Sequence, residues 1–134
     1  MDITSALLCD FAQVRDGLLF VSSGGITRMW RPELPGIMDL WLAVVVEVDL
    51  VEGRVPHEIL VRIIDEDGGE AATLQGSFQL NTDVDLNVGE RLLMPMPFDL
   101  RGVALPRYGA YDVTIYLDNQ LRRTLNFWCY PPPT

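Results

Sequence analysis

The residues of this chain that could do chemistry are few and lie far apart in the sequence. His57 is the sole histidine and sits in a turn beside Pro56. Histidine is the commonest general base, but no serine occupies a Gly-x-Ser-x-Gly nucleophile elbow. We therefore expect His57 to be a surface residue, and we expect no catalytic residues, no bound cofactor and no enzyme activity. A triad assembled from distant residues is the alternative.

Acidic residues form the best candidate metal site. Asp65 and Asp67 share one predicted loop, and Asp83 and Asp85 share another. Calcium takes six to eight oxygen ligands, and loops at one end of a β-sandwich can supply them. The loop over 83–87 has the alternating oxygen pattern of a calcium site but lacks the glycine and the terminal glutamate of an EF-hand. We expect these loop tips to be solvated. The alternative function is a ligand-binding sandwich that holds calcium at these loops or a small molecule between its sheets.

Apolar residues in two places suggest contacts with other proteins. Trp30 ends a predicted strand, and Leu34 lies in the predicted loop that follows it. Met94 and Met96 lie in another predicted strand, next to Pro95 and Pro97. Proline cannot donate a ladder hydrogen bond, so this strand is expected at the edge of a sheet. We expect these four apolar side chains to form an interaction surface for a protein partner or a second copy of the chain.

Alternating apolar and polar residues predict strands through most of the chain. The clearest pattern is a hairpin over residues 109–129, and the other predicted strands are 4–14, 18–22, 26–30, 38–51, 58–65, 72–80 and 91–100. About eight strands without an amphipathic helix predict an all-β, antiparallel β-sandwich, with a β-barrel as the alternative. We expect one sandwich domain over residues 1–130 and a proline-rich tail over 131–134.

The sandwich is expected to be immunoglobulin-like or C2-like. The immunoglobulin-like assignment rests on the turn that leads into Tyr111, because its sequence is typical of a tyrosine corner. In the hairpin, burial of one face favours a three-residue loop over 118–120 with a bulge. That register places Arg123 opposite Ile115 on the apolar face, where Asp10 is a candidate partner for a buried polar pair.

The charge balance excludes several kinds of partner. Ten basic residues, all arginine, against nineteen acidic ones give a net charge of −9. A body this acidic repels phosphate backbones and anionic lipid, so we expect neither nucleic acid nor membrane as a partner. No apolar run is long enough for a membrane helix, and the start of the sequence lacks the basic region of a secretory signal, which predicts a cytoplasmic location. There, Cys9 and Cys129 are expected to be buried thiols, and a disulfide between them is the alternative.

The opening segment also carries a family resemblance. Leu7-Leu8-Cys9-Asp10, then Gln13-Val14 and Gly17-Leu18-Leu19, lead to the paired glycines Gly24 and Gly25. With the Asp-Glu-Asp-Gly turn at 65–68 and the Gly-x-Tyr entry at 109–111, this pattern resembles a family of small bacterial all-β proteins of unknown function. The resemblance implies the fold, and it implies no activity and no catalytic residue.

Overall fold

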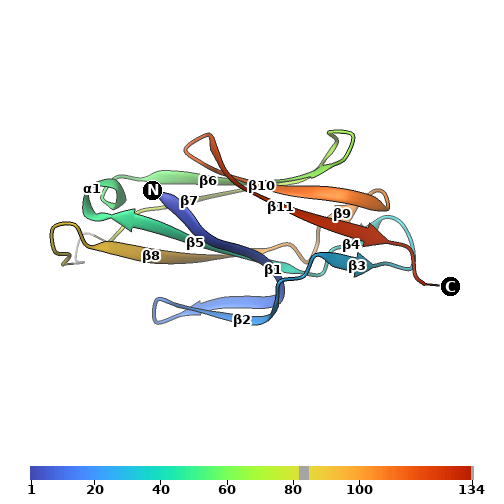
Figure 1. The fold of residues 1–134 in the computed structure, drawn as a ribbon, viewed down its shortest axis with the longest axis horizontal. Helices are drawn as coiled ribbons and strands as arrows, with labels where there is room; N and C mark the ends of the chain where they lie inside the picture. The colour runs from blue at the N-terminus through green and yellow to red at the C-terminus, as the bar shows by residue number, and fades with distance from the viewer. Residues whose placement is uncertain (82–84, 134) are drawn as a thin grey trace.

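The computed structural model describes residues 1–81 and 85–133, and strands make up most of it (Figure 1). Sheet A has the strand order β2-β1-β5-β8. Its strands are β1 (Asp2–Arg15), β2 (Leu18–Gly24), β5 (Trp41–Asp49) and β8 (Arg91–Asp99). The all-β prediction is therefore confirmed.

Sheet B lies against sheet A and has the order β3-β11-β10-β6-β7 (Figure 1). Its strands are β3 (Arg28–Trp30), β11 (Gln120–Tyr130), β10 (Gly109–Leu117), β6 (His57–Asp65) and β7 (Glu70–Phe78). The pairing of β3 with β11 is parallel, so the sandwich is not wholly antiparallel. Two further short strands, β4 (Gly36–Ile37) and β9 (Ala104–Leu105), pair with each other, and α1 (Leu50–Gly53) is a single helical turn.

The main core fills the space between the two sheets. Alternate residues of β5 point into it from sheet A, and alternate residues of β6 and β10 point into it from sheet B. The fully buried members from these three strands are Leu42, Val44, Val46, Val48, Ile59, Val61, Ile63, Tyr111, Val113, Ile115 and Leu117. Strands with one face buried thus follow the period of two that the sequence shows.

The long apolar segment at 38–51 forms a shorter strand than its composition predicts. Asp39 adopts a positive φ of 51°, and β5 begins only at Trp41. At the other end, the Asp49 carboxylate accepts a hydrogen bond of 2.7 Å from the backbone N–H of Glu52 and caps α1. Because a capping aspartate favours a helix start, the chain leaves the strand at that residue.

The hairpin β10–β11 departs from the predicted loop. Asp118 and Asn119 both have positive φ, and Leu117 pairs with Gln120, so the turn has two residues and not three. Successive positive-φ residues suit a type I′ turn, whose twist matches that of the strands. A register shift after Ile115 then restores the predicted pairs of Val113 with Leu125 and of Ile115 with Arg123. The predicted bulge is present, and it lies in the strand pair.

Tyr111 makes the hydrogen bonds of a tyrosine corner. Its hydroxyl donates to the Arg107 carbonyl at 2.7 Å and accepts from the Arg107 backbone N–H at 3.1 Å. Its ring is buried and stacks on Phe127, with ring centroids 5.3 Å apart. This contact fixes the loop that enters β10. Within the described residues, no helix has the length and apolar content needed to cross a bilayer.

Candidate protein-interaction surface

The β1–β2 hairpin is set apart from the two packed sheets. The first half of β1, as far as Cys9, pairs with β5, whereas the second half pairs only with β2 (Figure 1). A two-residue turn at Asp16 and Gly17, with φ of 53° and 74°, joins the strands. The Asp-Gly sequence favours this turn because both residues tolerate positive φ. Beyond Cys9 the hairpin therefore leaves β5 and turns back along the outer face of sheet A, on the side away from sheet B (Figure 1).

One side of the hairpin packs back on sheet A. Cys9, Ala12 and Ala43 are buried together in a second, smaller cluster, and Leu19 and Trp41 pack against it. Ala43 alternates with the core residues of β5, so this cluster lies on the outer face of sheet A. The contacts hold the hairpin in place without using the main core.

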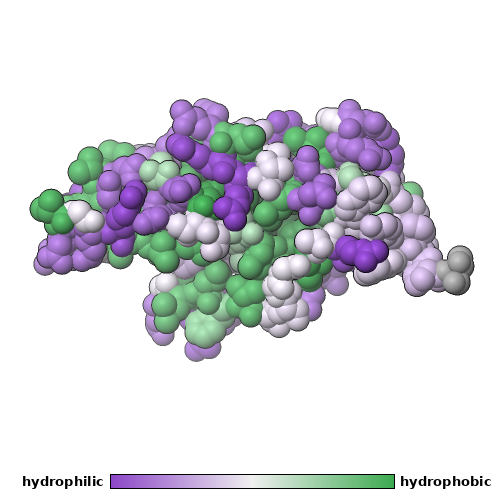
Figure 2. Space-filling model, in the orientation of Figure 1, coloured by the Kyte–Doolittle hydropathy of each residue, from purple (hydrophilic) through white to green (hydrophobic). Residues whose placement is uncertain are grey.

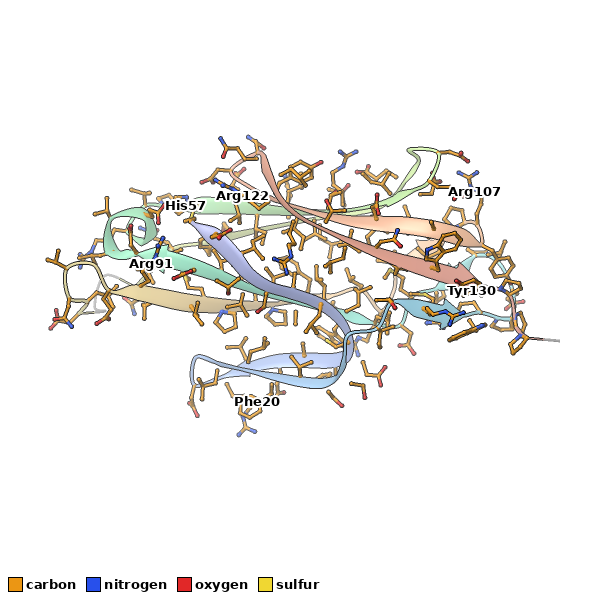
Figure 3. The ribbon with its side chains drawn as sticks, viewed as in Figure 1. Phe20, His57, Arg91, Arg107, Arg122 and Tyr130 are labelled. Atoms are coloured by element: carbon orange, nitrogen blue, oxygen red, sulfur yellow. The ribbon has the colours of Figure 1, made fainter. Side chains whose placement is uncertain are left out.

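The remaining apolar side chains of the hairpin are exposed. Their exposed fractions are 64% for Leu18, 51% for Phe20, 44% for Phe11, 40% for Val21 and 37% for Val14. We call these five residues the hairpin patch. Figure 2 shows hydrophobic residues gathered over this part of the surface, and Figure 3 shows Phe20 on β2, on the side of sheet A away from sheet B. The patch continues to Trp41, whose ring meets that of Phe11 edge-on with centroids 5.5 Å apart.

The four side chains that the sequence predicts to form an interaction surface lie in different environments. Trp30 and Leu34 are exposed by 45% and 42%. The Trp30 ring stacks on Tyr130, and the guanidinium of Arg28 lies over both rings at 5.3 and 5.0 Å. These contacts strengthen the three-residue pairing of β3 with β11.

Met94 and Met96 do not form an exposed surface, which corrects that expectation. Both are partly buried and pack against the main core. The cause is the pairing of β8 with β5 along its whole length, because this pairing turns the methionine face inward and leaves Leu93 exposed by 58%. The edge position of β8 is as predicted.

Asp10 and Arg123 do not form a buried pair, which corrects a second expectation. Arg123 does lie opposite Ile115, but both Asp10 and Arg123 are exposed. Sheet B pairs β3 with β11 only from Trp128 onward, so the first half of β11 is a free edge and Arg123 reaches water. An exposed charge at an edge needs no partner.

Arg107 binds two carboxylates of the first acidic loop. Its guanidinium binds the Asp65 carboxylate at 2.6 Å and also the Asp67 carboxylate. Arg107, with the backbone N–H of Gly69, lowers the pKa of Asp65. Asp85 is exposed, and Asp83 lies outside the described residues. Among the residues that the structure does describe, no group of three or more histidine, cysteine or acidic side chains is arranged to hold a metal ion.

His57 has both ring nitrogens engaged. Nδ1 lies 2.6 Å from Oδ2 of Asp118, and Nε2 contacts the Glu52 carbonyl oxygen. Burial lowers the pKa of His57, but the Glu52 carbonyl and the Asp118 carboxylate together outweigh burial and raise it above 6.5. Two acceptors can be satisfied at once only by the doubly protonated ring. His57 therefore links α1 to the β10–β11 turn, with both ring nitrogens bound within the protein.

Both cysteines are free and buried, as expected. Cys9 belongs to the small outer cluster and Cys129 to the main core. Burial raises the pKa of both thiols, which makes the reactive thiolate scarce.

Sequence reasoning missed the hairpin patch. A strand with a period of two is expected to bury one face, so the apolar residues of 18–22 read as half-buried. The signal in the sequence is the run Leu18-Leu19-Phe20-Val21, which is apolar on both faces of a short strand at the edge. Only Leu19 of that run is taken up by the outer cluster.

Comparison with known proteins bears on the chain as a whole. No curated protein matches it. The model of a family described as of unknown function, DUF6941, matches residues 4–128. This match covers all of sheet B except the last residues of β11, and nearly all of sheet A. The chain therefore belongs to DUF6941, a family of unknown function.

Proposed function

We propose that this chain is a non-catalytic protein-interaction module that associates through the hairpin patch. The observation that carries the proposal is the exposure of Phe11, Val14, Leu18, Phe20 and Val21 on one hairpin. Phe11, Leu18 and Phe20 share one face of the hairpin, and Val14 and Val21 share the face of Ala12 and Leu19. Adjacent exposed apolar side chains such as the first three are uncommon on soluble monomers and mark contact sites for other molecules.

The fold does not need this surface for its own core. The main core is complete between sheets A and B, and the hairpin is anchored by the separate cluster around Cys9, Ala12 and Ala43. Fully burying a Leu or Phe side chain is worth about 1.5–3 kcal/mol. A partner that covers Leu18 and Phe20 gains the part of this free energy that folding leaves unused.

Two observations support association over the other classes of function. His57 has both nitrogens bound within the protein, which weakens its candidacy as a general base. Arg107 forms ion pairs with Asp65 and Asp67. The carboxylate oxygens that calcium would need as ligands in this loop are therefore already bound to a guanidinium. The aromatic and aliphatic composition of the hairpin patch is instead the kind found at the centre of protein interfaces.

Two finer assignments belong to the same proposal. A cytoplasmic location fits the free thiols of Cys9 and Cys129, because reducing compartments keep thiols unpaired. An immunoglobulin-like relationship fits the hydrogen bonds of Tyr111 to Arg107.

Site-specific photocrosslinking in cells that carry the chain tests the proposed surface. A photoreactive residue at position 20 is expected to give a discrete crosslinked product. The matched control is position 121, because Leu121 is similarly exposed at 55% but lies on the opposite sheet. Equal yields at positions 20 and 121, or no product at 20, would contradict the proposal.

A further inference from the structure

Most free strand edges in the described residues have a feature that discourages pairing with another chain. β8 carries Pro95 and Pro97, β3 has only three residues, and the free part of β11 carries Arg122 and Arg123. Prolines, short strands and charged side chains are the usual means of protecting an edge.

β2 lacks these features. It has seven residues, Leu18–Gly24, without a charged residue or a proline, and β1 pairs with it on one side only. No strand pairs with its other side, and its side chains Leu18, Phe20 and Val21 are exposed. β7, the remaining edge of sheet B, alternates polar Thr73, Gln75 and Ser77 along its outer face. β2 is the one sheet edge here that combines length, neutrality and exposed apolar side chains.

The sequence of β2 is self-complementary when two copies pair in antiparallel orientation. A two-fold axis at Phe20 sets Phe20 opposite Phe20 of the second copy and Leu19 opposite Val21. It also sets Leu18 opposite Ser22 of the second copy. Within each chain, Ser22 already pairs with Phe11 of β1 on its other side. These cross-strand contacts, above all that of Phe20 with Phe20, shield part of the apolar face of each hairpin from water.

Charge opposes a second copy less at β2 than at the acidic parts of the surface. Each chain carries a net charge of −9, so two copies repel each other wherever acidic surfaces meet. β2 is neutral, and the register centred on Phe20 opposes no charged residue with another. The charges of the hairpin, Asp10, Arg15 and Asp16, lie away from the centre of the strand.

We propose that the partner at the hairpin patch is a second copy of this chain, joined by antiparallel pairing of the two β2 strands about a two-fold axis. The two four-stranded sheets A become one continuous sheet. The inference rests on the proposed function and names its partner. An interface limited to two hairpins is small, so the dimer is expected to form reversibly.

Sedimentation equilibrium of the purified chain, from low micromolar to submillimolar concentration, tests the dimer. The wild-type chain is expected to pass from monomer to dimer, and Phe20→Lys and Leu18→Lys are each expected to raise the dissociation constant at least tenfold. Both positions are exposed, so the variants should fold, which circular dichroism checks. Leu121→Lys is the matched control and should dimerise as the wild type does.

Hydrogen exchange identifies the paired strand. Amides in β2 are expected to gain protection as the concentration of the wild type rises, and not in Phe20→Lys. A wild type that stays monomeric at submillimolar concentration overturns the dimer, as does a dimer that Phe20→Lys leaves intact. If the purified chain is monomeric while position 20 still crosslinks to a different protein in cells, the interaction surface stands and the second copy is rejected. If neither occurs, both proposals fail.

Discussion

At the scale of single residues, the chain's one histidine has both ring nitrogens bound within the protein. His57 bridges the Glu52 carbonyl and the Asp118 carboxylate, and its ring stacks on Phe78 at 5.5 Å. Its sequence context, a turn beside a proline, predicts exposure, but only 11% of its side chain is exposed. The contact with Asp118 spans sixty-one positions, which no local pattern reveals.

The raised pKa of His57 predicts how stability depends on pH. Because the pKa in the folded protein lies above 6.5, protonation stabilises the fold, and this contribution is fully present below pH 6.5. It is lost as the pH rises through the folded-state pKa. Urea unfolding of the wild type should therefore show stability falling over this range relative to His57→Gln, which cannot titrate.

Nuclear magnetic resonance gives an independent measurement, since a single histidine produces a single imidazole titration. The expected midpoint lies above 6.5 in the wild type. Asp118→Asn is expected to move it downward, because the carboxylate then no longer favours the charged ring. A wild-type midpoint at or below 6.5 would mean that burial outweighs the two acceptors.

At the scale of elements, pattern predicts strands well and their ends poorly. The period of two places the buried residues of β6 and β10 correctly, because each strand has one face in the main core. The same pattern runs past the true ends of β5, where Asp39 and Asp49 take conformations that end the strand. Those ends depend on backbone dihedral angles and a cap, which outweigh side-chain hydrophobicity locally.

The β10–β11 turn shows how a reasonable criterion can choose the wrong loop. Matching apolar faces favours three residues, but the structure has two, and the bulge after Ile115 corrects the register further along. Asp118 suits the turn for a second reason, since its carboxylate also accepts a hydrogen bond of 2.9 Å from the Glu58 N–H. A tertiary contact thus selects the shorter turn.

The turn makes a testable prediction at Asn119, whose φ is 66°. Asn119→Val is expected to destabilise the protein by roughly 1–3 kcal/mol, because a β-branched residue is strained at positive φ. Asn119→Gly is the matched control and should be neutral or stabilising, since glycine adopts this conformation freely. Thermal or urea unfolding measures both variants. Equal stability of the two would show that position 119 does not hold the left-handed conformation.

At the scale of the whole molecule, one hairpin stands out from an otherwise closed sandwich. Overall composition predicts an acidic protein with a buried core, and this is what the sheets form. It does not predict where apolar surface remains exposed, because that depends on how the β1–β2 hairpin folds back on the outer face of sheet A. The fold class could therefore be predicted from the sequence, whereas the candidate surface could be identified only from the structure.

The hairpin patch as a contact surface is tested most directly by thiol labelling at position 20, comparing intact cells with the diluted, purified protein. Cys9 and Cys129 are buried with raised pKa values, so they contribute little labelling. Phe20→Cys is expected to label much more slowly in cells than in the dilute protein, whereas Leu121→Cys should show the same ratio as a free surface thiol. If Phe20→Cys and Leu121→Cys show the same ratio, nothing covers the hairpin patch in the cell and the proposed function is contradicted.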